Sequence, residues 1–194
     1  MIQKKKLKYF IFNKPYGVIC QFSGQGKPTL ADFGPFQDDV YPAGRLDADS
    51  EGLIFLTNDG KVNHTLLDPR YGHRRTYLVQ IERTPTESDL QRLRDGIIIE
   101  KKKTLPSEVR LLDTEPDVPE RAIPIRFRKN VPTAWLELTL REGRNRQVRK
   151  MTAAIGFPTL RLVRIAIESI TLNHLSPGEH RELSAHDVHT LLNL

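Results

Sequence analysis

Short apolar stretches separated by turn-forming residues dominate the pattern of the chain. Residues 7–22, "LKYFIFNKPYGVICQF", predict a strand, a Lys-Pro-Tyr-Gly turn and a second strand. Residues 53–57, "LIFLT", have the continuous apolar character of a short buried strand, and residues 75–82, "RTYLVQIE", alternate well enough for another. Further strands are expected over residues 97–100, 104–112, 134–140 and 160–167.

Helical stretches are short and have recognisable ends. Asn58 or Asp59 can cap a helix over 60–67 that stops before a proline. A capping-box sequence starts a second helix over 86–96, which closes on a glycine. Two more helices are expected, over 145–156 and from Ser184 onward.

This mixture of elements predicts an α+β fold, with a mixed, mainly antiparallel sheet flanked by helices and loops. Residues 23–45 have the glycine, proline and aspartate density of a loop. The acidic, proline-rich segment 113–121 is expected to be a loop or a disordered insertion, and it could mark a boundary between two halves. Because the strands on either side are too few to close separate cores, we favour one domain over 1–194.

Charge favours a polyanionic partner. The 194 residues contain 30 Lys and Arg against 24 Asp and Glu, a net charge of +6. Such a balance suits nucleic acid or an acidic membrane face. One cysteine excludes an intrachain disulfide and a cysteine-based zinc site. The chain has no signal-peptide pattern and no apolar run of about eighteen residues, so we expect a soluble cytoplasmic protein without a membrane partner.

Several familiar catalytic motifs are missing from the sequence. It contains neither a phosphate-binding Gly-x-x-x-x-Gly-Lys-Ser/Thr loop nor a Gly-x-Gly-x-x-Gly after a strand, and it has no Gly-x-Ser-x-Gly elbow. His186 and His189 share a predicted helix face, but no third ligand accompanies them. We therefore expect no metal site.

A strongly basic stretch spans residues 141–150, "REGRNRQVRK", with five basic residues against one acid. On a helix that begins near residue 145, Arg146, Arg149 and Lys150 fall on one face. Guanidinium groups suit phosphate oxygens, so this face is a candidate RNA or DNA track, which Arg161 and Arg164 extend. The alternative is a solvated helix face, although the stretch has no acid four residues away to neutralise it.

The stretch "AGRLDADSEGL", residues 43–53, places Asp47 and Asp49 after Arg45 and ahead of a buried strand. From composition alone, a polar turn with an internal ion pair is favoured. A carboxylate here could instead be a nucleophile or a base if a cation keeps it ionised. A nuclease that uses Asp47, Asp49 and Glu51 with a divalent ion is a further alternative.

Six segments, in order along roughly residues 9–183, resemble pseudouridine synthases of the RsuA/RluB/RluE family. The family's central signature is similar to "AGRLDADSEGLIFLTNDG", and its opening Asn-Lys-Pro segment to "FNKPYGV". The tyrosine strand, the third motif and the closing pattern match "RTYLVQI", "EGRNRQVRKM", "GFPTLRLVRIAI" and "LSPGEHREL".

The resemblance implies a mixed antiparallel sheet crossed by an RNA-binding cleft. It implies an isomerase that converts a chosen uridine of RNA to pseudouridine by breaking the N1–C1′ bond and rejoining the base through C5. No metal or organic cofactor is implied.

The resemblance also implies roles for individual residues. Asp47 falls at the catalytic aspartate, which attacks or deprotonates the ribose, whereas Asp49 lies at a variable position and is expected at the surface. Tyr77 matches the tyrosine that stacks on the target base, and Arg149 matches the basic residue that pairs with the catalytic carboxylate. The expected RNA-binding or site-support residues are Arg45, Arg144, Arg146, Gln147, Lys150, Arg161 and Arg164.

One departure from the family pattern bears on the substrate. Many relatives carry an N-terminal RNA-binding module of the S4 type, but here the catalytic pattern begins by residue 9. This difference and the stretch 142–162 resemble the RluE branch, which implies 23S ribosomal RNA as the partner. We expect the protein to be a monomer. Target selection would then rest on the basic surface of the catalytic domain. The alternative is a non-catalytic RNA-binding or ribosome-assembly factor, although a pure binder has no need of an aspartate that faces an arginine.

Overall fold

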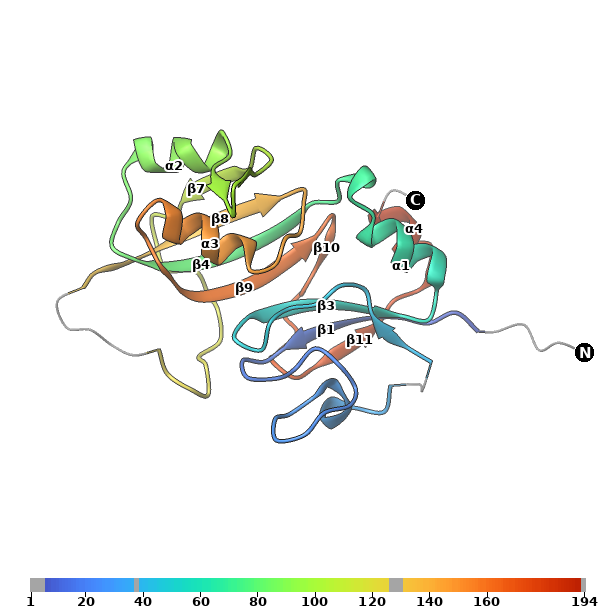
Figure 1. Ribbon diagram of the computed structural model, residues 1–194. Coiled ribbons are helices and arrows are strands. Elements are labelled where there is room, and N and C mark those ends of the chain that lie inside the picture. The colour runs from blue at the N-terminus through green and yellow to red at the C-terminus, as the bar shows by residue number, and fades with distance from the viewer. Residues whose placement is uncertain (1–5, 37–38, 126–130, 193–194) are drawn as a thin grey trace, which may run out of the picture. The chain divides into compact units, whose positions relative to one another are not determined.

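The structure, a computed structural model, describes residues 6–36, 39–125 and 131–192 (Figure 1). The chain divides into two compact units. One comprises Met1–Tyr71 with Glu168–Leu194, and the other comprises Gly72–Ile167. The acidic segment 113–121 lies inside the second unit, so it does not mark the boundary between the two units. The interpretation of 1–194 as one catalytic domain stays a prediction.

The first unit is built on a group of antiparallel strands. Its central strand β1 (Tyr9–Lys14) pairs on one side with β11 (His180–Glu182) and on the other with β3 (Glu51–Thr57). Every residue of β1 and β3 is buried, which explains why 53–57 forms a continuous apolar run. A short strand β2 (Tyr41–Pro42) also pairs with β3, and β10 (Ile170–Thr171) lies in the same unit.

Helix α1 (Gly60–Leu67) has the bounds that the sequence predicts. The Asp59 side chain accepts hydrogen bonds from the backbone N–H of Lys61 at 2.9 Å and of Val62 at 3.3 Å. It therefore satisfies two donors that a helix N-terminus leaves without partners. Helix α4 (Ala185–Leu192) belongs to the same unit. Short 3-10 turns η1 (Leu30–Phe33) and η2 (Pro69–Tyr71) complete the unit.

The predicted second strand of residues 7–22 is wrong. After the turn, Ile19 makes a single bridge to Thr29 and no ladder forms. The reason lies in the backbone partners. The carbonyl of Val18 accepts a hydrogen bond from the Lys14 ammonium at 2.9 Å, and the N–H of Ile19 donates to Pro28 at 2.8 Å. These groups are used by a lysine and a loop, so they do not pair with a neighbouring strand.

The second unit is built on another group of antiparallel strands. Its strands run in the order β9 (Thr159–Ile167), β4 (Arg75–Glu82), β8 (Thr133–Leu140) and β7 (Glu108–Leu111). Strand β4 has the bounds that its alternating pattern predicts. A separate hairpin joins β5 (Ile98–Ile99) to β6 (Lys102–Lys103).

Helices α2 (Glu87–Arg94) and α3 (Gln147–Ala154) lie on one side of this sheet in Figure 1. The capping box that starts α2 is present, with Thr86 accepting from the backbone N–H of Asp89. On another part of the unit, Leu78, Trp135 and Val163 form a buried cluster against which Val118 packs. The segment 113–121 contains no helix or strand and is a loop, as predicted, and its Val118 covers this cluster.

Two other boundaries differ from the prediction. The helix expected from residue 145 begins at Gln147, because Arg146 adopts a left-handed conformation with φ of 51°. The strand expected over 104–112 is confined to Glu108–Leu111. Before it, the backbone N–H of Leu105 donates to the Glu142 carboxylate and that of Ser107 to the Arg94 carbonyl. The α+β class and the antiparallel sheet pairings are confirmed.

Candidate active site

Asp47 lies in the first unit, in the loop that leads into β3. Its side chain and that of Asp49 are half-buried, so Asp49 is less exposed than expected. Leu46, 8% exposed, anchors the loop in the core, whereas the neighbouring Arg45 is exposed. The carbonyl of Asp47 accepts from the N–H of Ser50 at 3.0 Å and closes a turn around both aspartates.

The Lys-Pro-Tyr-Gly turn supports this loop. The backbone N–H of Gly17 donates to the carbonyl of Ala48, between the two aspartates, at 2.7 Å. Gly17 has φ of +85°, a conformation that favours glycine. The turn of the opening motif therefore holds the backbone of the aspartate motif.

A buried lysine lies beside the same loop. Lys14 is fully buried, and its ammonium donates to the carbonyls of Pro15 and Val18, each at 2.9 Å. Burial lowers the pKa of Lys14 to about 8, and the charges of Cys20, Glu51, Asp49 and Asp47 act in the opposite direction. The sequence patterns do not single out this cation as a site residue, although it stands within the "NKPYG" motif.

Tyr77 and Arg164 face each other across two strands of the second unit. In the register of β4 and β9, Tyr77 is the partner of Arg164, next to a shift in the pairing at Thr76 and Tyr77. Both side chains are buried, at 8% and 3% exposure. Because cross-strand partners share a face of the sheet, the Tyr77 and Arg164 side chains lie on the same face.

Arg149 lies in α3 and is half-buried. Its guanidinium donates through Nη1 to the carbonyl of Thr159 at 3.3 Å, and the hydroxyls of Thr152 and Thr159 lie 2.7 Å apart. These contacts connect α3 to the start of β9 and hold the guanidinium of Arg149 at the Thr159 carbonyl.

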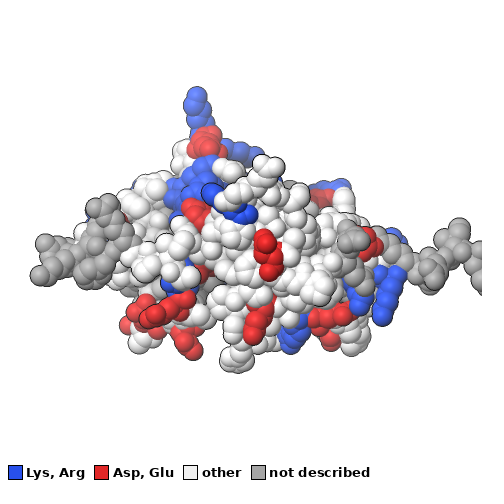
Figure 2. Space-filling view, turned by 90° about the horizontal axis from the view of Figure 1, so that it is seen from below, with Lys and Arg blue, Asp and Glu red and all other residues white. Residues whose placement is uncertain are grey.

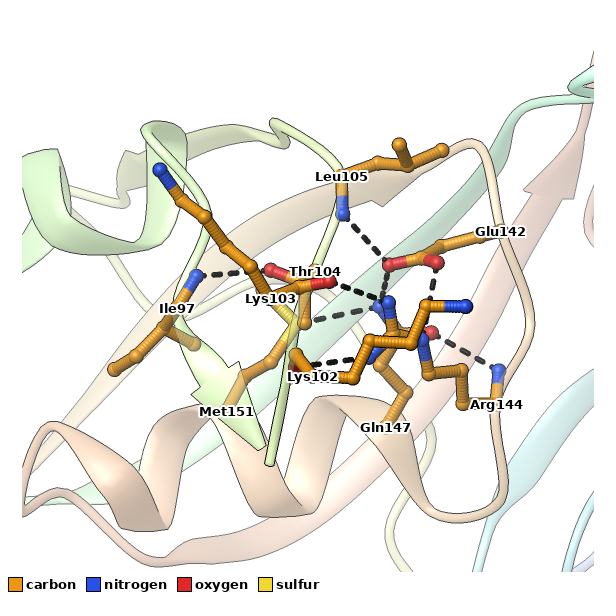
Figure 3. Close-up of polar contacts among 9 residues, drawn as sticks. All are labelled: Ile97, Lys102, Lys103, Thr104, Leu105, Glu142, Arg144, Gln147 and Met151. Atoms are coloured by element: carbon orange, nitrogen blue, oxygen red, sulfur yellow. Dashed lines mark hydrogen bonds and ion pairs between the residues drawn. The ribbon is translucent and has the colours of Figure 1, made fainter. Parts of the chain in front are cut away.

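Arg144 and Gln147 make contacts inside the protein (Figure 3). Gln147 is 4% exposed, its Oε1 accepts from the backbone N–H of Arg144 at 2.9 Å, and its Nε2 donates to Glu142 at 2.7 Å. The Arg144 guanidinium donates to Glu142 at 3.2 Å and to the carbonyls of Lys102 at 3.1 Å and Lys103 at 2.6 Å. Arg144 and Gln147 are expected to bind RNA or to support the site. Their contacts hold the protein backbone, as a supporting role requires.

The other basic candidates differ in their surroundings. Arg146 is exposed at the N-cap of α3. Lys150 donates to Glu100 at 2.6 Å, an acid far along the chain, so it is neutralised although no acid lies four residues away. Arg161 is 7% exposed, and its guanidinium donates to the carbonyl of Pro119 in the acidic loop at 2.8 Å. An RNA-binding role for each stays a prediction.

The structure brings together Arg144 with Gln147, and Tyr77 with Arg164, within the second unit. Asp47 and Arg45 belong to the first unit, and the pairing of Asp47 with Arg149 stays a prediction. No group of three or more His, Cys, Asp or Glu that could hold a metal ion occurs within 6–36, 39–125 and 131–192. Over the same part of the chain, no helix is both long and apolar enough to cross a membrane.

Charge is divided over the surface that Figure 2 draws. Lys and Arg side chains and Asp and Glu side chains form small separate groups there, with uncharged surface between them. The net charge of +6 therefore does not make one continuous basic surface on this face.

Comparison with known proteins gives a consistent answer. Residues 8–154 match the RNA pseudouridylate synthase family. The chain is 55% identical over 170 residues to ribosomal large subunit pseudouridine synthase E of Xanthomonas axonopodis pv. citri, covering 86% of this chain and 89% of that protein. It is 52% identical over 177 residues to the protein of the same name in Vibrio parahaemolyticus, covering 91% and 74%.

A solved structure agrees with these relatives. The crystal structure of a pseudouridylate synthase matches with a TM-score of 0.80 and 30% identity, over 97% of this chain and 75% of that one. The fold and the ordered motifs define an isomerase that acts on RNA. The chain belongs to the RNA pseudouridylate synthase family.

Proposed function

We propose that this chain converts a specific uridine of large-subunit ribosomal RNA, 23S rRNA, to pseudouridine, with Asp47 as the catalytic carboxylate. The observation that carries the proposal is the Asp47 loop. Its carboxylate lies half-buried within the matched segment 8–154, on a backbone that Gly17 holds at Ala48. The ribosomal substrate is supported by relatives at 52% and 55% identity that are named ribosomal large subunit pseudouridine synthases.

The reaction conserves every atom of the substrate. The N1–C1′ bond breaks, the base turns, and a C5–C1′ bond forms. The proton that leaves C5 is balanced by the proton that N1 gains, so no co-substrate is consumed. The carboxylate of Asp47 serves as the nucleophile or base toward the ribose.

The target base has to leave its stack before the glycosidic bond can be reached, which costs a few kcal/mol. An aromatic ring that stacks on the extruded base contributes about 1–3 kcal/mol. We assign this role to Tyr77. Arg149 is assigned as the cation that pairs with the Asp47 carboxylate and orients it.

Pseudouridine mapping tests the proposal directly. Deproteinised large-subunit rRNA that lacks the modification is incubated with the chain, and pseudouridine is located by primer extension after chemical derivatisation. We expect one modified position or a small set, with the same yield in excess chelator. Binding without pseudouridine would support the non-catalytic RNA-binding alternative. Cleavage of the RNA that stops in excess chelator would support the nuclease alternative.

A further inference from the structure

The hairpin formed by β5 and β6 carries a run of lysines that the proposed chemistry does not use. Lys101 lies at the tip, and Lys102 and Lys103 form the second strand. All three side chains are exposed. Since Ile99 pairs with Lys102, only Glu100 and Lys101 make the turn.

The backbone of this hairpin is held at its base. Arg144 binds the carbonyls of Lys102 and Lys103 at 3.1 and 2.6 Å, and Glu142 accepts from the backbone N–H of Leu105 at 2.9 Å. Figure 3 draws these contacts, with the side chains of Lys102 and Lys103 extending away from each other. The main chain of the lysines is thus fixed while their ammonium groups stay at the surface.

The hairpin carries a net positive charge. Its one acidic residue, Glu100, accepts a hydrogen bond from the Lys150 ammonium of α3 at 2.6 Å. In the part of the chain that the structure describes, no ion pair joins Lys101, Lys102 or Lys103 to an acid. Three cations therefore stand on one narrow projection.

The tip of the hairpin has an unusual backbone. Glu100 and Lys101 both have positive φ, 49° and 66°, which is the geometry of a tight hairpin turn that Asn-Gly normally occupies. A lysine at the second position is strained where glycine is not.

An open hollow adjoins the hairpin. It has a volume of ≈ 590 Å³, and its lining includes Arg92, Ile98 and Lys103 together with the acid Asp95. The Asp95 carboxylate accepts from Gln91 at 2.8 Å. Two cations and an apolar side chain, Ile98 at 67% exposure, suit a phosphate and the sugar or base attached to it.

We infer that this hairpin is a phosphate-binding arm that contacts the backbone of the substrate RNA apart from the Asp47 loop. The inference rests on the proposed function. Alternate residues of a strand point to opposite faces, so Lys102 and Lys103 present charge on both sides of the hairpin. A folded RNA can place phosphates on both sides of such a projection, whereas a flat membrane surface meets one side. The arm strengthens binding and leaves the bond-breaking step to other residues.

The test removes the charges without disturbing the turn. In the variant K101G/K102Q/K103Q, glycine is the residue that the tip conformation favours, so the hairpin is expected to stay folded. The matched control, K6Q/K27Q/K61Q, removes three exposed lysines of the first unit and has the same net charge. The measurements are affinity for a transcript of large-subunit rRNA at several KCl concentrations, and the single-turnover rate at saturating RNA.

We expect the hairpin variant to bind about tenfold or more weakly, with its salt slope shallower by about 0.7–0.9 for each phosphate that it no longer binds. Its rate at saturating RNA should stay near that of the unchanged protein, and the control should bind nearly normally. Unchanged affinity and slope would overturn the inference, as would an equal loss of affinity in the control. If the unchanged protein makes no pseudouridine, the proposed function fails, while the affinity measurements still decide the role of the hairpin.

Discussion

The backbone N–H of Gly17 donates to the carbonyl of Ala48 at 2.7 Å, which joins the Lys-Pro-Tyr-Gly turn to the loop of Asp47. Gly17 makes this bond with φ of +85°, and a Cβ added there would have no neighbour within 4 Å. The requirement for glycine is therefore conformational and not steric. Two motifs that stand about thirty residues apart in the sequence form one support for the candidate catalytic carboxylate.

Replacement of Gly17 by alanine should cost about 1 kcal/mol of unfolding free energy, because an L-residue is strained in the left-handed region. It should also lower kcat more than it raises KM, since the loop of Asp47 shifts. Urea denaturation and steady-state kinetics measure both effects. The control is Gly143→Ala, where a Cβ also meets nothing within 4 Å and φ is not positive. A Gly17 variant as stable and active as the Gly143 variant would contradict this role of the turn.

The buried ammonium of Lys14 should make stability depend on pH. Burial lowers its pKa from 10.5 to about 8 in the folded protein. Below pH 8 both states hold the proton, so the cost of burying the charge is fully present. As the pH rises from 8 to 10.5, the folded state releases the proton while the unfolded state keeps it, so the stability of the folded state increases.

Lys14→Met lacks this titration. We expect the unfolding free energy of the unchanged protein, relative to that of the variant, to rise by about 3 kcal/mol over this pH range, at 1.36 kcal/mol per pKa unit. Tyr9, whose pKa is raised to about 12 by burial and by its hydrogen bond to Asp59, is present in both proteins and cancels. Denaturation curves between pH 7 and 10.5 measure the difference. A difference that stays flat with pH would show that Lys14 keeps its ordinary pKa.

Glu142 should be more important for stability than an exposed acid. It accepts from the buried Gln147 amide at 2.7 Å and from the Leu105 N–H at 2.9 Å. Glu142→Ala leaves these donors without their acceptor, at a cost of about 1–3 kcal/mol. Glu108→Ala, which removes an exposed ion pair with Arg74, should cost less than about 1 kcal/mol. Thermal unfolding compares the two, and faster amide exchange at Leu105 is expected only for the Glu142 variant. Equal destabilisation would rule out this role for Glu142.

The secondary structure follows from the sequence where local signals agree. Helix α1 has its predicted bounds because Asp59 caps one end and Pro69 stops the other. Strand β4 has its predicted bounds because its apolar positions alternate.

The prediction fails where a distant side chain takes the backbone partners. Lys14 uses the Val18 carbonyl, and Glu142 uses the Leu105 N–H, so neither segment completes the strand that its apolar pattern favours. Pattern alone carries no information on such contacts.

Only part of the candidate site is predictable from the sequence, because tertiary contacts also determine which side chains are available. The motif order selects Asp47, Tyr77 and Arg149 by resemblance. The order of the motifs does not reveal that the Arg144 guanidinium donates hydrogen bonds to the carbonyls of Lys102 and Lys103, because that contact depends on tertiary structure. The run of lysines over 101–103 is visible in the sequence, but only the hairpin geometry distinguishes it from an ordinary charged surface.

Arg149→Met should lower kcat at least about tenfold, since a cation that orients the catalytic carboxylate contributes to the chemical step. RNA affinity should change little. Arg146→Met removes a neighbouring exposed arginine and should have a small effect on kcat. Single-turnover rates at saturating RNA separate the two. If the Arg149 variant reacts as fast as the Arg146 variant, Arg149 does not belong to the proposed site.

Asp47 is the centre of the proposed mechanism, and its conservative replacement tests that mechanism most directly. Asp47→Asn keeps the size of the side chain and removes the negative charge. Asp49→Asn, two residues away in the same half-buried loop, is the matched control. The measurement is the amount of pseudouridine formed on large-subunit rRNA in a single turnover, with RNA affinity measured in parallel.

We expect no detectable product from the Asp47 variant, although its RNA affinity should stay within a few-fold of that of the unchanged protein. The Asp49 variant should keep substantial activity. Pseudouridine formation by the Asp47 variant at the rate of the Asp49 variant would contradict the assignment.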